Sequence, residues 1–97
     1  MTAKTAPAAQ AMMAAATRMR GVRETAVDKW GTVTLTFNSG ATLTVRATAL
    51  GAAPVKANGR VVGQLDLGRN EFRSASGRVT SVLGRLDALT MLTRNYL

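Results

Sequence analysis

The sequence contains no cysteine and no histidine. The missing cysteines exclude disulfide bonds and thiolate metal sites. The missing histidines remove the commonest general base and the commonest metal ligand of proteins. No apolar run approaches the length of about 18 residues that a membrane-spanning helix needs. We therefore expect a protein of the reducing cytoplasm that spans no membrane and holds neither a metal nor another cofactor.

Carboxylates are also scarce, because the chain has only five acidic residues. They are spread along the sequence at Glu24, Asp28, Asp66, Glu71 and Asp87. A catalytic carboxylate pair would need a tertiary contact between distant segments, and no serine or threonine has a histidine to activate it. Gly59, Gly63 and Gly68 lack the helix and lysine that follow a phosphate-binding glycine loop. The sequence therefore predicts that the protein is not an enzyme.

Aromatic residues make up 4% of the chain, and they are Trp30, Phe37, Phe72 and Tyr96. Much of the remaining apolar content is alanine, so we expect a thin core in a chain of this length. A thin core favours stabilisation by a partner or by a second copy of the chain, and a homodimer is one expectation. We expect Trp30 to cover the core at the start of a strand, with base stacking as the alternative role.

The clearest structural signal lies in the middle of the chain, where threonines alternate with apolar residues. Thr32–Phe37 and Thr42–Thr48 both show this alternation, and Asn38-Ser39-Gly40 separates them. A period of two predicts strands with one apolar face. A short break that contains glycine predicts a tight antiparallel turn, so the two runs are expected to form a hairpin.

A second hairpin is predicted further along the chain. Asn58-Gly59 lies between Val55–Ala57 and Arg60–Leu67, and this dipeptide is typical of a two-residue turn. Gly63 in the second arm indicates a bulge or a bend. The two hairpins together predict an antiparallel sheet of four strands over residues 30–68.

Helical patterns lie on both sides of this sheet. After a frayed lead-in over residues 1–7, residues 8–20 are rich in alanine and methionine and contain no internal glycine or proline, which predicts a helix. Apolar residues also recur at helical spacing over residues 77–96. We therefore predict a single α+β domain over residues 1–97, in the order α-β-β-β-β-α, with both helices on one face of the sheet.

Two segments connect these elements. Val22–Lys29 is expected to form a connector or a short strand, and Arg69–Ser76 a polar linker. Ser74 and Ser76 are both candidate N-caps for the last helix. Gly84 inside that helix indicates a place where another element could cross closely.

Basic residues are far more numerous in the chain than acidic residues. Thirteen lysines and arginines against five acids give a formal net charge of +8. Such a balance is typical of proteins that bind nucleic acid, anionic lipid or acidic proteins. Two other interpretations stay open, namely a composition favoured by a GC-rich genome and a basic surface that only maintains solubility.

The basic residues gather near the ends of the predicted helices and hairpins. Arginine pairs bidentately with phosphate and stacks on bases, so an arginine-rich face would bind nucleic acid mainly through its backbone. We therefore expect a small non-enzymatic protein that contacts nucleic acid or a nucleoprotein complex. The candidate polyanion-binding residues are Arg18, Arg20, Arg23, Arg46, Lys56, Arg60, Arg69 and Arg73.

Three alternatives remain beside this hypothesis. In size and composition the chain is similar to accessory proteins of phages and mobile elements, such as anti-CRISPR inhibitors, which occlude a host complex by protein–protein contact. It could equally be a structural homo-oligomer. Residues 1–23 contain basic residues but no acid before Glu24, a composition that also occurs in mitochondrial transit peptides. The sequence leaves open whether DNA or RNA is preferred and whether the arginines share one face.

Overall fold

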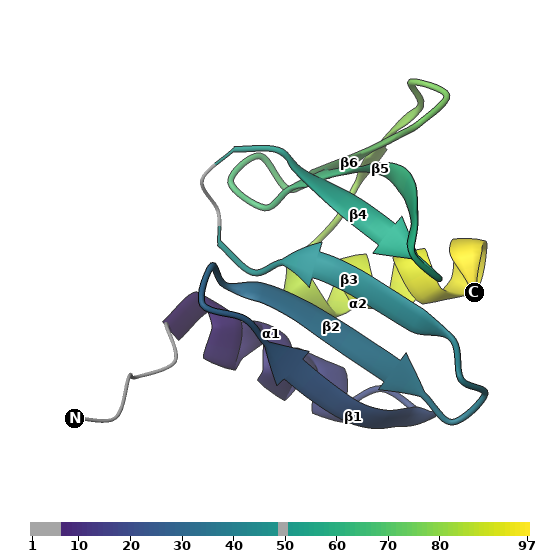
Figure 1. Ribbon diagram of the computed structural model, residues 1–97. Helices are drawn as coiled ribbons and strands as arrows, with labels where there is room; N and C mark the ends of the chain where they lie inside the picture. Colours follow the sequence, from purple (N-terminus) through teal and green to yellow (C-terminus); the bar gives the residue numbers. More distant parts are fainter. Residues whose placement is uncertain (1–6, 49–50) are drawn as a thin grey trace.

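The computed structural model describes residues 7–48 and 51–97 (Figure 1). It contains two helices, α1 (Pro7–Thr17) and α2 (Arg85–Tyr96), on either side of seven strands in the sequence. The strands are β1 (Val22–Val27), β2 (Thr32–Phe37), β3 (Thr42–Arg46), β4 (Ala53–Ala57), β5 (Arg60–Asp66), β6 (Glu71–Ser74) and β7 (Val79–Ser81). Apart from Pro7, which begins α1, the predicted lead-in lies outside the described residues.

All seven strands form one sheet in which each strand pairs antiparallel with its neighbours in sequence order. The prediction of an α+β fold is therefore confirmed, whereas the prediction of a four-stranded sheet is wrong. The three additional strands come from segments without a clear alternating pattern. β1 occupies the segment expected to be a connector or short strand, β6 the expected linker, and β7 the start of the expected last helix.

The predicted central hairpin is present as β2 and β3. Leu35 pairs with Leu43 and Val33 with Val45, and all four side chains are fully buried. Thr34 pairs with Thr44 on the other face of the sheet, as the period of two requires. The threonines of these strands are half-buried and point away from the core.

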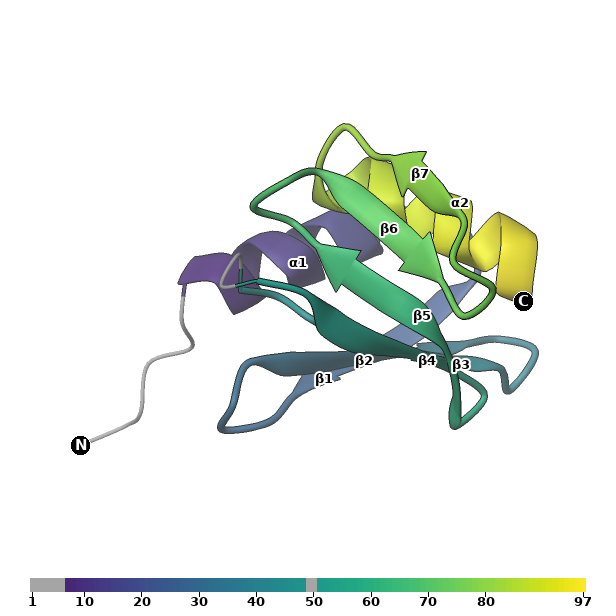
Figure 2. The same ribbon diagram turned by 90° about the horizontal axis from the view of Figure 1, so that it is seen from above.

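The second predicted hairpin forms β4 and β5, and it also bends the sheet. Its turn has positive φ at both Asn58 (53°) and Gly59 (81°), the backbone that an Asn-Gly turn supplies. Val55 pairs with Gly63 but Lys56 pairs with Val61, so β5 contains one extra residue at the predicted bulge. A bulge increases the local twist of a sheet. β1–β4 are accordingly seen face-on in Figure 1, and β5–β7 in Figure 2.

Both helices lie on the same face of this curved sheet, as predicted (Figures 1 and 2). Ala9, Met12 and Ala16 form the buried side of α1, where small side chains permit a close approach to the sheet. Leu89 and Leu92 form the buried side of α2 together with Ala88. Phe72 of β6 is almost completely buried and contacts Tyr96 of α2 edge-on, with ring centroids 5.8 Å apart.

The last helix begins at residue 85 and not at residue 77 as predicted. Gly77 and Gly84 both have positive φ, 93° and 126°, and these conformations interrupt a helix between them. Ser74 is no helix cap, because its Oγ accepts a hydrogen bond from the backbone N–H of Arg78 within the β6–β7 turn (3.1 Å). Gly84 occupies the N-cap position of α2, and no described residue other than its chain neighbours has an atom within 4 Å of the place of its missing Cβ, so the predicted close crossing there is wrong.

Among the described residues, neither helix has the length and apolar character needed to cross a membrane.

Candidate functional site

The face of the sheet opposite the two helices is covered by no other element of the described chain (Figure 1). Because side chains alternate between the faces of a strand, this outer face receives every second residue of β2, β3 and β4. On β2 and β3 these residues are mainly threonines, and the Oγ atoms of Thr34 and Thr44 lie 3.3 Å apart, within hydrogen-bonding distance. The outer face is therefore rich in hydroxyl groups.

Two basic residues stand beside these threonines. Arg46 pairs with Thr32 across β2 and β3, and Lys56 pairs with Thr44 across β3 and β4. The four side chains, together with Ala53 and Pro54, line a hollow of about 180 Å³ that we call the outer hollow. Its lining contains two cations, two hydroxyls and no carboxylate. This arrangement attracts anions, because both charges have the same sign and the hydroxyls can donate hydrogen bonds.

A neighbouring hollow of about 200 Å³ on β5 and β6 has a balanced charge. It is lined by Arg69 and Arg73 but also by Asp66 and Glu71. The Arg69 Nε lies 3.9 Å from Asp66 Oδ2, and the Arg69 backbone N–H donates to Asp66 Oδ1 (3.1 Å). The two hollows therefore differ in charge, because cations are the only charged residues that line the outer hollow, whereas Asp66 and Glu71 offset Arg69 and Arg73 in its neighbour.

An exposed aromatic residue lies at the end of the sheet that carries Arg46. Trp30, in the β1–β2 turn, is 69% exposed, so the prediction that it covers the core is wrong. Lys29 Nζ lies 4.6 Å from the centroid of the Trp30 ring, a cation–π distance. The next residue, Gly31, accepts a hydrogen bond from the N–H of Ala47 (3.0 Å), which immediately follows Arg46. Trp30 is therefore held close to the end of β3 that carries Arg46.

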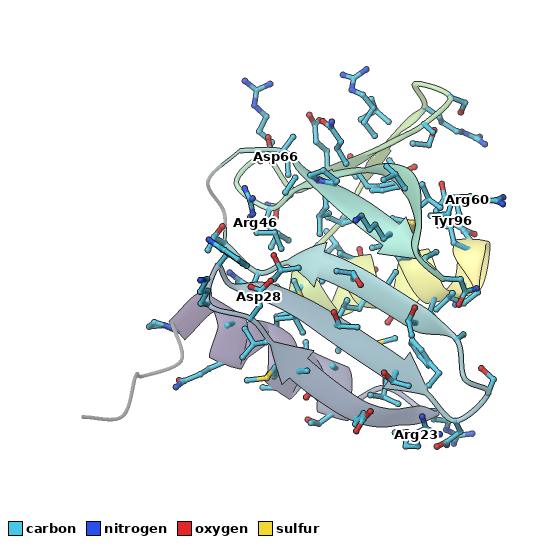
Figure 3. All side chains as sticks on the ribbon, in the orientation of Figure 1. Arg23, Asp28, Arg46, Arg60, Asp66 and Tyr96 are labelled. Atoms are coloured by element: carbon cyan, nitrogen blue, oxygen red, sulfur yellow. The ribbon has the colours of Figure 1, made fainter. Side chains whose placement is uncertain are left out.

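Asp28 fixes the shape of this turn. Its Oδ1 accepts hydrogen bonds from the backbone N–H groups of Trp30 and Thr32, both at 2.9 Å. Gly31 adopts a positive φ of 80°, which completes the reversal. An aspartate that accepts from residues two and four positions later is typical of local turn formation. Figure 3 shows Asp28 and Arg46 at the same end of the sheet.

Arg85 holds the end of β3 from the helix side. Its guanidinium Nη2 donates to the carbonyl oxygen of Ala47 (3.0 Å), and this contact joins the first turn of α2 to the strand end next to Arg46. The Arg85 Nε is buried and has no hydrogen-bond partner among the described residues. Arg85 therefore connects the packing of α2 to the position of the outer hollow.

The structure brings together only some of the predicted binding residues. Arg46 and Lys56 share the outer hollow, and Arg69 and Arg73 share its neighbour. Arg23 of β1 and Arg60 of β5 lie at the opposite end of the sheet from Arg46 (Figure 3). All of these residues remain candidates, but they do not form one continuous patch.

Arg18 and Arg20 lie on the helix side of the molecule. They follow α1 and line a separate groove between the end of that helix and α2, together with Arg94. The sheet lies between the two helices and the outer face (Figure 2). The two arginines closest to α1 therefore cannot act at the outer hollow.

Sequence reasoning missed the association of Trp30, Thr32 and Thr44 with the basic residues. The signal that could have placed Trp30 in a turn was Asp28 followed three residues later by Gly31, since both residue types favour reversals. Within the described residues, no group of three acidic, cysteine or histidine side chains could hold a metal ion. No family model, curated protein or solved structure matches this chain.

Proposed function

We propose that this protein binds nucleic acid, free or within a nucleoprotein complex, through the outer hollow and without catalysis. The observation that carries the proposal is the pairing of Arg46 and Lys56 with the hydroxyls of Thr32 and Thr44, in a hollow without a carboxylate. A phosphate group matches this set because its oxygens accept hydrogen bonds from guanidinium, ammonium and hydroxyl groups at once.

The neighbouring aromatic residue favours nucleic acid over a simple anion. An exposed tryptophan beside phosphate-binding cations offers a base a surface for stacking. Trp30 is held beside the end of β3 by the hydrogen bond between Ala47 and Gly31, and Lys29 adds a charge at its ring. One stacking residue and several cations support binding through the backbone, with little sequence preference.

The net charge of +8 adds a long-range contribution. A strongly basic protein associates faster with a polyanion, and added salt weakens this attraction. Arg73 extends the cationic surface from the outer hollow towards β6, whereas Arg69 is engaged with Asp66. We therefore assign the main phosphate contacts to Arg46 and Lys56 and an additional contact to Arg73.

The experiment is a titration of fluorescein-labelled duplex DNA, single-stranded DNA and RNA with the protein over a series of salt concentrations, followed by anisotropy. Binding should weaken steeply with salt, with a slope of log K against log salt of about −0.9 for each phosphate contact on duplex DNA. Trp30 is the only tryptophan, so quenching of the intrinsic emission should accompany binding.

The ranking of the three probes then identifies the target class. Absence of binding to all three probes at low salt would contradict the proposal. Binding without any salt dependence would contradict it as well, because phosphate contacts by cations release counterions.

A further inference from the structure

The groove between α2 and the segment that follows α1 is chemically distinct from the outer face. Its uncharged lining residues, which we call its floor, are Met19, Leu86, Thr90 and Thr93, and its volume is about 420 Å³. Most of its surface is apolar, and its volume lies within the range of about 300–1,000 Å³ that is common for binding sites. We call it the helix groove.

The two threonines on its floor contribute apolar surface. Thr90 Oγ1 donates to the carbonyl oxygen of Leu86, and Thr93 Oγ1 donates to that of Leu89, both at 2.8 Å. Their hydroxyl hydrogens are therefore already used within α2. The methyl group of each threonine remains as its apolar contact surface, and Leu86–Thr93 span about two turns of α2.

The rim of the helix groove is strongly cationic. Arg18, Arg20 and Arg94 line it, and no carboxylate does. Among the described residues the one ion pair is that of Arg69 with Asp66, so none of the three rim guanidiniums is neutralised there. Asp87 lies in the first turn of α2, where its Oδ2 accepts from the backbone N–H of Leu83 (2.7 Å).

An apolar floor with a cationic rim matches an amphipathic helix that carries acidic residues beside its apolar stripe. The floor residues Leu86, Thr90 and Thr93 lie at helical spacings i, i+4 and i+7, and they form one ridge along α2. An incoming helix can pack its own ridge beside this ridge of α2. The phosphates of a nucleic acid could pair with the arginines, but a nucleic acid would leave the apolar floor without a partner.

A second copy of this chain does not supply such a helix. The described part of α1 contains no acidic residue, and α2 contains only Asp87, which is engaged at its own helix start. We propose that the helix groove binds an acidic amphipathic helix of a different protein. This function is separate from nucleic-acid binding, and it gives the molecule two binding faces on opposite sides of its sheet.

The test is a selection from a displayed library of random peptides of about 16 residues, long enough for four helical turns. The protein is the bait, and the variant R18Q/R20Q/R94Q is used for counter-selection. We expect the enriched peptides to share apolar residues at i, i+3 or i+4 and i+7, together with Asp or Glu on the flanks. Failure to enrich any such pattern over the counter-selection would overturn the proposal.

The best enriched peptide is then synthesised with a fluorescent label and its affinity is measured by anisotropy. R18Q/R20Q/R94Q should weaken binding at least about tenfold, the effect of losing roughly 1.4 kcal/mol of interaction. The matched control is R46Q/K56Q/R73Q, which removes the same number of charges from the outer face and should leave the affinity within about twofold. Equal losses in both variants would show attraction by net charge alone and would overturn the proposal.

A second variant tests the apolar floor with the rim intact. Met19→Gln should weaken peptide binding by at least about threefold, because it replaces apolar contact area with an amide. Unchanged affinity would contradict the docking of an apolar stripe. A duplex DNA probe that loses affinity in R18Q/R20Q/R94Q but not in R46Q/K56Q/R73Q would also overturn the proposal, because the groove would then belong to the nucleic-acid surface.

Discussion

Gly63 of β5 lies directly against Phe72 of β6. A Cβ atom at position 63 would be 2.5 Å from Phe72 Cζ and 2.3 Å from the backbone oxygen of Arg73. Phe72 is almost fully buried and the Arg73 oxygen belongs to the main chain, so neither atom can move away easily. Glycine is therefore required here for close packing, next to the bulge at which the sheet bends.

We predict that Gly63→Ala destabilises the protein by about 3 kcal/mol or more, at or above the upper end of ordinary overpacking effects. Urea unfolding followed by circular dichroism measures the loss. Gly59→Ala is the control, because no described residue beyond its chain neighbours lies within 4 Å of its missing Cβ, and its positive φ of 81° is what opposes a side chain. That variant should lose about 1–2 kcal/mol. Equal losses in the two variants would contradict the role of the Phe72 contact.

The second prediction concerns the turn that presents Trp30. Asp28→Ala removes the acceptor of two backbone hydrogen bonds, and we expect a loss of about 1–2 kcal/mol in the free energy of unfolding. The Trp30 ring should also become more mobile, which the anisotropy of its intrinsic fluorescence reports. Asp28→Asn keeps an acceptor oxygen and should retain much of both properties. If Asn and Ala have the same effect, the hydrogen bonds do not hold the turn.

The third prediction separates stacking from charge at the proposed nucleic-acid site. Trp30→Ala should lower the affinity for labelled nucleic acid at least about fivefold, since a stacked base contributes about 1–3 kcal/mol. The slope of affinity against salt should stay unchanged, because no phosphate contact is lost. The thermal midpoint should change little, because the side chain is mainly exposed. Unaltered affinity would remove Trp30 from the site.

Much of the fold was predictable from local signals. The alternation in β2 and β3 identified both strands and their inward rows, since one buried face leaves a period of two in the sequence. Asn58-Gly59 identified the second turn because both residues tolerate positive φ. The alanine and methionine of residues 8–20 likewise identified a helix, although α1 ends at Thr17.

The end of the sheet was not predictable in the same way. Val79 and Val82 fit the spacing of a helix, yet Val79 is exposed in β7 and only Val82 is buried. β7 has three exposed residues, and its pairing with β6 depends on tertiary context that a short pattern does not encode. Gly77 and Gly84 have positive φ, and these two glycines were the local indication that no helix forms between them.

The chemical character of the candidate site was predictable from the sequence, but its position was not. Composition identified basic residues as the candidate binding residues, but the eight candidates are scattered over the sequence without a common period. The pairing of Thr32 with Arg46 and of Thr44 with Lys56 brings Arg46 and Lys56 together in the outer hollow. Arg18 and Arg20 belong to the other side of the sheet because they follow α1.

The most direct test of the central claim compares two variants that each remove three positive charges from the net charge of +8. R46Q/K56Q/R73Q changes the outer face and R18Q/R20Q/R94Q changes the helix groove, and duplex DNA affinity is measured by anisotropy over a salt series. We predict that the outer-face variant loses at least about tenfold in affinity and up to about 2.7 from the salt slope, at 0.9 for each phosphate contact, whereas the groove variant stays close to the unmodified protein. Equal losses in the two variants, or a larger loss in the groove variant, would contradict a nucleic-acid site on the outer face.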